Sequence, residues 1–163
     1  MGIFKKTDAE IAAKAGARAA KQALKDAGMS PAQLRARKYL FNDVRIKAKL
    51  YGVNMDKTGT ISDPNDRRTS GPIIGAAATV DTAQAIGSRV TATRMVTMGV
   101  FALAAKKKTG EVFVLIEHPD YAFTAGPISA KDVEGARKWA RDFNTVAADA
   151  EEFGLPEGTR AAA

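Results

Sequence analysis

The sequence predicts an α+β fold in which a seven-stranded antiparallel sheet precedes one long amphipathic helix. Three observations support this prediction. The stretch Arg89–Glu117 is dominated by Val, Thr, Ile and Phe and contains a polar, glycine-bearing segment, Lys106–Glu111, as in consecutive strands joined by a solvated turn. Val44–Tyr51 alternates apolar and polar residues with a period of two, as a half-buried strand does. After Ser129, apolar residues recur every three or four positions, which is typical of a helix packed on a sheet.

The expected strands are separated by segments rich in glycine, proline, Asn and Asp, such as the loop Asp63–Gly75. Arg89–Glu117 supplies the fourth to sixth strands, a meander that we expect at the centre of the fold. In chain order, the strands are expected at Val44–Tyr51, near Thr60–Ile61, and at Ala76–Ala83, Val90–Thr97, Val100–Ala105, Val112–Ile116 and Tyr121–Ala125.

Two helices are expected before the first strand. Thr7 and Glu10 form a capping box, and residues that favour helix continue from there to Gly28. Ser30 is expected to cap a second, shorter helix that starts with proline and runs to about Phe41. We therefore expect three parts: a basic helical extension over residues 1–41, a folded domain over 42–150, and a disordered tail over 151–163.

The long C-terminal helix is expected to start at Ser129, with Asp132 completing a weaker capping box. Its apolar face is expected to be buried against the sheet. This face consists of Val133, Ala136, Trp139, Ala140, Phe143, Val146 and Ala147.

Positive charge is concentrated in the first third of the 163-residue chain, which carries a net charge of +7. Residues 1–50 hold 12 Lys or Arg against four acidic residues, whereas the remaining 113 hold 13 against 14. Such asymmetry favours contact with nucleic acid, an anionic membrane or an acidic protein, unless it only solvates a helix face. The absence of cysteine excludes disulfides and thiolate metal sites. No segment has the pattern of a signal peptide or a membrane span, so a cytoplasmic location is expected.

Several short patterns occur together along the chain. They are Ala78-Thr79-Val80 with Thr82-Ala83, Arg89-Val90-Thr91-Ala92-Thr93-Arg94, Gly99-Val100-Phe101-Ala102-Leu103, Lys106-Lys107-Lys108-Thr109, Phe113, and Ala136, Ala140 and Phe143-Asn144 on the last helix. Over roughly residues 44–148 the chain resembles an uncharacterised family of pleckstrin-homology-like (PH-like) proteins from actinobacteria and their phages. The resemblance implies a seven-stranded barrel of two nearly orthogonal sheets, closed at one end by the C-terminal helix. It leaves residues 1–30 unexplained and implies no particular activity.

The residues themselves favour a protein that is not an enzyme. The only histidine, His118, precedes a proline in an expected turn, without a second base or nucleophile beside it in the sequence. No nucleophile elbow, phosphate-binding loop or zinc-binding helix motif is present. We therefore expect no catalytic residues, no metal site and no cofactor.

Two sets of basic residues are candidates for contact with a partner or an anion. The first comprises Lys14, Arg18, Lys21 and Lys25 on one face of the first helix, with Arg45, Lys47 and Lys49 on the outward side of the first strand. The second is Lys106, Lys107 and Lys108 at a hairpin tip, which are otherwise explained as a solvated turn. Our main hypothesis is a non-catalytic protein-interaction or scaffolding module, or a chain that self-associates. The resemblance described above permits a phage origin, in which case a host protein would be the partner. Nucleic-acid binding by the first set is the alternative, and an anionic membrane surface is a weaker one.

Overall fold

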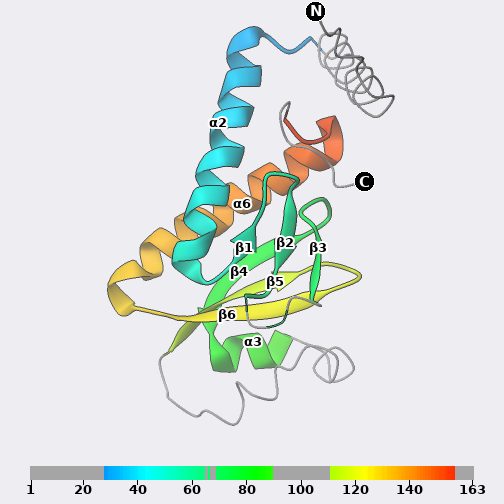
Figure 1. Cartoon of the computed structure of the whole chain (residues 1–163). Helices are drawn as coiled ribbons and strands as arrows, with labels where there is room; N and C mark the ends of the chain where they lie inside the picture. The colour runs from blue at the N-terminus through cyan, green and yellow to red at the C-terminus, as the bar shows by residue number, and fades with distance from the viewer. Residues whose placement is uncertain (1–27, 65, 67–68, 90–110, 157–163) are drawn as a thin grey trace, which may run out of the picture.

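A computed structural model of the chain describes residues 28–64, 66, 69–89 and 111–156. These residues form two three-stranded antiparallel sheets and two long helices, α2 and α6, that cross each other (Figure 1). The predicted α+β class is therefore confirmed. The helix expected before Gly28 and the strands expected at Val90–Thr97 and Val100–Ala105 lie outside the described residues.

Helix α2 (Pro31–Ala48) begins where the sequence predicts a helix and ends later than predicted. The Ser30 hydroxyl accepts a hydrogen bond from the Gln33 amide at 3.3 Å, and the Gln33 side chain accepts one from the Ser30 amide at 2.7 Å, which completes a capping box. A 3₁₀ turn, η1 (Lys49–Tyr51), continues the helix. The chain leaves it at Gly52, whose φ of +73° suits glycine.

The strand predicted over Val44–Tyr51 is wrong, because these residues complete α2 and form η1. Val44 and Ala48, four residues apart, are buried, whereas Ile46 and Leu50 are exposed. Burial therefore follows the spacing of a helix and not the period of two that the sequence shows. Apolar residues at every second position include pairs four apart, so the same letters also fit one face of a helix. The cap at Ser30 starts a helix that good helix formers then continue.

The first sheet consists of β1 (Asn54–Met55), β2 (Thr60–Ser62) and β3 (Ser70–Pro72), in that order. Strand β2 corresponds to the second predicted strand. Strands β1 and β3 lie in segments predicted as a turn and a loop, because two or three residues are too few to show a period.

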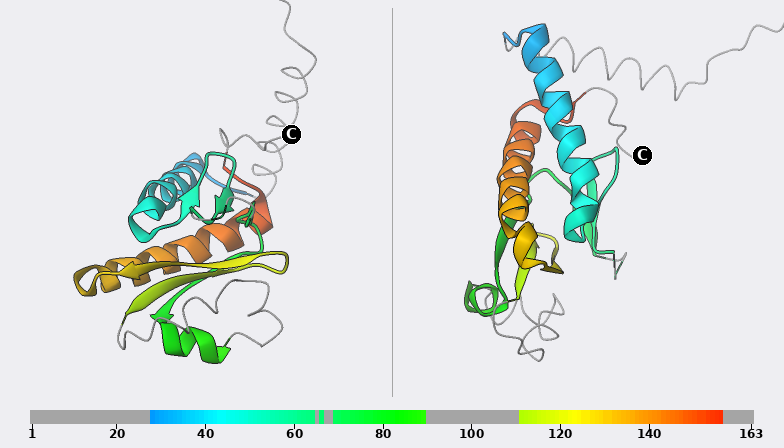
Figure 2. Two further views of the ribbon diagram at one scale, coloured as in Figure 1. Left: turned by 60° about the horizontal axis from the view of Figure 1, so that its bottom comes forward. Right: turned by 90° about the vertical axis from the view of Figure 1, so that its left-hand side faces the viewer.

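The second sheet consists of β4 (Ala77–Thr82), β5 (Val112–Glu117) and β6 (Ala122–Ile128), with β5 in the centre. All three strands correspond to predicted ones. Alternate residues of β5 contact different cores, because Val114 and Ile116 belong to the main core, whereas Phe113 and Leu115 pack against α3 (Ala83–Arg89). Both faces of β5 are therefore covered, which explains its continuous apolar run. Figure 2 shows α3 on the side of this sheet away from α6.

A 3₁₀ turn, η2 (Ala130–Asp132), precedes α6 (Val133–Phe153). The predicted apolar face of this helix is confirmed: Val133 is half-buried, and the other six residues of the face are buried. The capping box predicted from Ser129 and Asp132 is not formed, because the chain enters the helix through η2 without a side-chain cap. The helix reaches into the predicted disordered tail, and Pro156 beyond it is buried.

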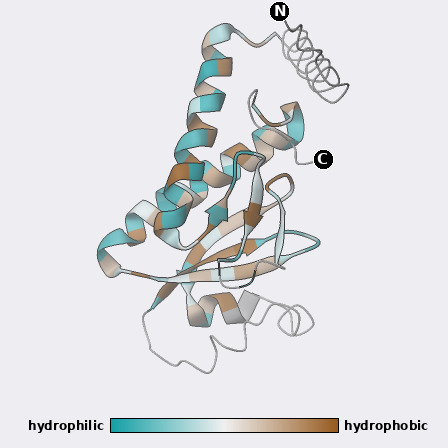
Figure 3. Ribbon diagram, in the orientation of Figure 1, coloured by the Kyte–Doolittle hydropathy of each residue, from teal (hydrophilic) through white to brown (hydrophobic). Residues whose placement is uncertain are grey.

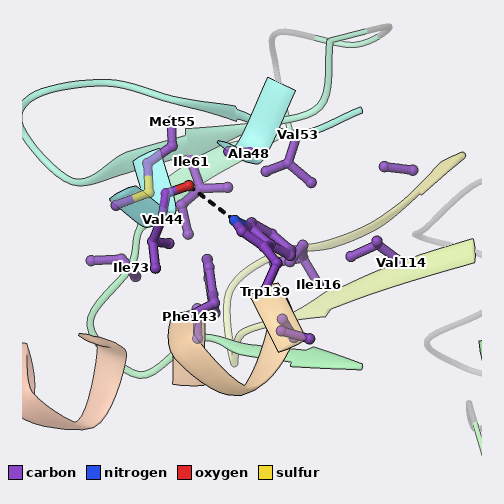
Figure 4. Close-up of a cluster of buried hydrophobic side chains, with 14 of the residues drawn as sticks. Val44, Ala48, Val53, Met55, Ile61, Ile73, Val114, Ile116, Trp139 and Phe143 are labelled. Atoms are coloured by element: carbon purple, nitrogen blue, oxygen red, sulfur yellow. Dashed lines mark hydrogen bonds between the residues drawn. The ribbon is translucent and has the colours of Figure 1, made fainter. Parts of the chain in front are cut away.

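The core lies where α2, α6 and the two sheets meet. Trp139 of α6 is at its centre, with Val44 of α2, Ile61 of β2 and Ile116 of β5 among the side chains around it (Figure 4). On the outer part of the helix pair, Arg37 of α2 forms an ion pair of 2.6 Å with Asp149 of α6. Helix α2 is thus an integral layer of the fold.

This arrangement alters two further expectations. The six strands of the described residues form two separate sheets and do not close into a barrel. The boundary expected between residues 41 and 42 lies inside α2, whose Phe41 and Val44, on either side of it, belong to the same core. Within the described ranges, no helix is long and apolar enough to cross a membrane.

Candidate functional site

The outward side of α2 and η1 exposes three large apolar side chains. Tyr39 is 75% exposed, Ile46 65% and Leu50 74%. The described part of the chain has one other exposed side chain of this kind, Ile74, at 37%. Because residues seven and four positions apart in a helix lie above one another, these three side chains share one face. We call Tyr39, Ile46 and Leu50 the apolar stripe.

The folding of α2 explains why the stripe points outward. Phe41, Val44 and Ala48 are at most 1% exposed and pack into the core, so they fix which side of the helix faces inward. The apolar stripe lies on the other side, and α2 therefore has apolar residues on two faces. Figure 3 shows hydrophobic and hydrophilic residues interspersed along the whole helix. A helix that covers a core on one side only is normally polar on the other.

Basic side chains surround the apolar stripe. Arg35 lies one turn before Tyr39, in line with the stripe. Lys38 and Lys49 are eleven residues, or about three turns, apart and flank the stripe on one side. Asp43 and Lys47 flank it on the other side and form an ion pair of 2.8 Å, whose hydrogen bond raises the pKa of Lys47. The stripe and these five charged residues together are called the α2 face below.

The α2 face has an excess of positive charge. Arg35, Lys38 and Lys49 are exposed and form no ion pair with any described residue, whereas Lys47 is neutralised by Asp43. Arg37, which belongs to the same helix, points inward and is held by Asp149. The three unpaired cations therefore give the face a local charge of about +3 next to its apolar centre.

The structure does not gather Arg45, Lys47 and Lys49 on one side, as the predicted strand required. Successive members of this set are about 200° apart around a helix. Arg45 is half-buried, and its Nε has no hydrogen-bond partner among the described residues. Burial would raise the pKa of the nearby Asp56 carboxyl, but hydrogen bonds from Thr58 and Thr60 and the charge of Arg45 outweigh it and lower that pKa. Arg45 is thus directed towards the fold, and only Lys47 and Lys49 remain at the surface.

The other predicted contact residues cannot be placed relative to this face. Lys14, Arg18, Lys21 and Lys25, and Lys106, Lys107 and Lys108, all lie outside the described residues.

One alternative binding surface, the edge of β4 that pairs with no strand of the described residues, is occupied from within the chain. The Asn144 side chain of α6 accepts a hydrogen bond from the Ala78 amide at 2.7 Å and donates one to the Ala78 carbonyl at 3.0 Å. A side-chain amide thereby takes the place of a neighbouring strand at Ala78. Addition of a partner's strand at this point would have to displace Asn144.

His118 has a structural role. Its side chain is 9% exposed and stacks on Tyr121, with ring centroids 4.7 Å apart. Nδ1 lies 3.1 Å from the Asp120 amide, which donates to it, and Nε2 lies 3.1 Å from the Ile74 carbonyl. The Nδ1 contact is made within the β5–β6 turn, and the Nε2 contact joins this turn to the segment after β3. The described residues contain no group of three or more His, Cys, Asp or Glu arranged to bind a metal.

Comparison of the chain with protein-family models, with curated proteins and with solved structures found no match. The relationship to PH-like proteins therefore stays a prediction.

The sequence analysis did not identify the apolar stripe. The alternation over Val44–Tyr51 places Ile46 and Leu50 on the inward side of a strand, and Tyr39 lies in a separate helix that is expected to end near Phe41. Their spacing of seven and four residues becomes visible only when the helix is continued past Phe41.

Proposed function

We propose that this chain is a non-catalytic protein-interaction module that binds a protein partner through the α2 face. The observation that supports this most strongly is the apolar stripe, in which three large side chains are 65–75% exposed on one side of a folded helix. Contiguous exposed apolar patches that are rimmed by polar residues mark interaction sites. An aromatic and aliphatic centre with a charged rim is also the usual composition of a protein–protein interface.

The apolar stripe has no evident role in the fold. Tyr39, Ile46 and Leu50 leave most of their surface in water, so their burial contributes little to stability. The fold is stabilised by the opposite side of α2, through Phe41, Val44 and Ala48. A contact outside the fold accounts for apolar residues at these positions.

Nucleic-acid binding is the second candidate, and the exposed Arg35, Lys38 and Lys49 favour it. Affinity for nucleic acid comes mainly from Lys and Arg side chains that contact the phosphates and release counterions. The centre of the α2 face is apolar, and its cations lie at the rim, an arrangement that suits a protein partner better. The proposal does not depend on membership of the PH-like family, because α2 is not part of a barrel in the described structure.

Site-specific photocrosslinking in cells tests the proposal. A photoreactive amino acid is introduced in place of Tyr39, or in place of Ile74 as a control exposed elsewhere in the chain. We expect the Tyr39 position to give a discrete protein adduct that the Ile74 position does not give. A second substitution, Leu50→Ser, should reduce the yield of this adduct.

Two outcomes would contradict the proposal. If both positions gave the same adducts, the α2 face would not be a specific surface. If the adduct from position 39 were nucleic acid and vanished after nuclease treatment, the second candidate function would replace the first.

A further inference from the structure

We infer that the partner segment that covers the α2 face is an acidic amphipathic helix. Its apolar residues would pack on the apolar stripe, and its carboxylates would lie against Arg35, Lys38 and Lys49. This inference rests on the proposed function and specifies the chemistry of the partner.

Charge complementarity supports an acidic partner. Arg35, Lys38 and Lys49 are exposed and without an ion pair among the described residues, and Lys47 already has one with Asp43. Charged groups at the rim of an interface steer association and select partners of opposite sign. A basic partner segment would bring like charges together along the whole flank formed by Lys38 and Lys49.

The shape of the surface supports a helix. The apolar stripe runs from residue 39 to residue 50, a length of about 16 Å at 1.5 Å per residue. It is a straight ridge along a helix, and such a ridge packs well beside a second helix at a distance between axes of about 8–10 Å. Apolar residues at spacings of three, four and seven on the partner would meet the stripe.

A second copy of this chain is a poor occupant. In a parallel symmetric pair, the Lys38 and Lys49 flank of one copy would meet Asp43 and Lys47 of the other, which neutralise each other. In an antiparallel symmetric pair, that flank would meet the same flank of the other copy. The cost of juxtaposed like charges argues against this pairing.

The chain's own remaining segments are poor occupants for the same reason. Residues 1–27 hold six Lys or Arg against three acidic residues, and residues 90–110 hold four Lys or Arg and no acidic residue. Residues 157–163 contain one of each sign. None of these segments carries the excess negative charge that would complement the positive α2 face.

An anionic membrane would meet the same cations, but the face is less suited to it. Asp43 borders the apolar stripe and would be carried towards the anionic headgroups. The stripe offers three apolar side chains over about three turns, which is little surface to insert. A folded acidic helix can avoid Asp43, whereas a uniformly anionic surface cannot.

Peptide display tests the inference without knowledge of the natural partner. A library of random helix-forming peptides is selected on the immobilised full chain and, in parallel, on the Ile46→Ser/Leu50→Ser double variant. Both substitutions are at exposed positions, and circular dichroism checks that the variant remains folded. We expect the peptides enriched on the unmodified chain alone to be net negative, with apolar residues three or four positions apart.

One enriched peptide is then synthesised and its affinity measured. Charge reversal by Lys38→Glu/Lys49→Glu should weaken binding at least about tenfold, as should raising the salt concentration, which screens rim charges. The control is Lys57→Glu/Lys131→Glu, which reverses two exposed lysines outside α2 and should leave affinity unchanged.

The outcomes separate this inference from the proposed function. Enriched peptides that are neutral or basic, yet still need Ile46 and Leu50, would overturn the acidic partner and leave the protein-binding face intact. If the double variant selected the same peptides as the unmodified chain, or no peptide were enriched, both would fail. Binding to phosphatidylserine vesicles that is lost in the double variant, without enrichment of acidic peptides, would identify a membrane surface and overturn the inference.

Discussion

The indole nitrogen of Trp139 donates a hydrogen bond of 2.9 Å to the carbonyl oxygen of Val44 and so joins α6 to α2 inside the core (Figure 4). Trp139 is 2% exposed. The centroid of its ring lies 5.5 Å from the ring centroid of Tyr51 and 5.3 Å from that of Phe143. The carbonyl is on the inward side of α2, opposite the apolar stripe. The contact therefore fixes the rotation of α2 and, with it, which side chains face the solvent.

Replacement of Trp139 by Phe should destabilise the fold by about 1–3 kcal/mol, because it removes a buried hydrogen bond and leaves part of the indole site empty. Urea unfolding followed by circular dichroism measures this change, since the substitution removes the only tryptophan. Tyr39→Phe, an exposed aromatic substitution on the same pair of helices, is the control and should leave the midpoint unchanged. An equal midpoint for both variants would mean that the Trp139–Val44 contact contributes nothing.

Replacement of Asn144 by Ala should destabilise the fold by about 1–3 kcal/mol, because it leaves the amide and carbonyl of Ala78 without their partner. It should also promote aggregation, since the edge of β4 becomes available for strand pairing. Light scattering during refolding measures the second effect. Thr145→Ala on the adjacent, exposed position is the control. Refolding of Asn144→Ala as clean as that of the control would show that β4 needs no such protection.

The strands that could be predicted from the sequence are those with enough residues to show a pattern. Strands β4, β5 and β6 have six or seven residues each, and the apolar face of α6 extends over several helical turns. Strands β1 and β3 could not be predicted, because pairing with β2 defines them, and not their own two or three residues. The helix α3 was not predicted, because its residues after Ala83 lie between the strands expected at Ala76–Ala83 and Val90–Thr97 and are too few to show a helical repeat.

The candidate site was missed because of one ambiguous segment. Residues 44–50 alternate in polarity, which fits a strand, yet they continue a helix that starts 13 residues earlier at a strong cap. The pattern within the segment could not decide between the two structures, because the cap at Ser30 and the core residues Phe41 and Trp139 lie outside it. Once the helix is known, exposure of Ile46 and Leu50 follows from the burial of Val44 and Ala48.

Stability at high pH should depend on Tyr121. Its hydroxyl donates a hydrogen bond of 2.6 Å to the Pro72 carbonyl, and burial raises its pKa above the ordinary value of 10.0. Because the folded-state pKa of Tyr121 is raised, the unfolded chain releases the phenolic proton at a lower pH than the folded chain does. The stabilisation by the protonated Tyr121 is therefore fully present below about pH 10 and is lost as the pH rises further. The free energy of unfolding should therefore fall more steeply above pH 10 in the unmodified chain than in Tyr121→Phe.

Urea unfolding of both proteins at several pH values measures this difference. Near neutral pH, Tyr121→Phe should be less stable by about 1 kcal/mol, because it lacks the hydrogen bond to Pro72. Tyr39 and Tyr51 are present in both proteins, so they do not contribute to the difference between the two pH profiles. Parallel pH profiles would show that the Tyr121 hydroxyl titrates as freely in the folded chain as in the unfolded one.

The rotation of α2 can be tested at two neighbouring positions. Val44 is 0% exposed and Ile46 is 65% exposed, although both are β-branched and lie two residues apart in the same helix. Val44→Ala should destabilise the fold by about 1–3 kcal/mol through lost burial and the cavity that remains. Ile46→Ala should change stability by less than about 0.5 kcal/mol, as surface substitutions do, and helix propensity favours alanine at both sites alike. In a strand with both side chains inward, the two substitutions would cost similar amounts. Equal losses in urea unfolding would therefore remove the helical assignment of residues 44–48, and with it the exposed stripe on which the α2 face depends.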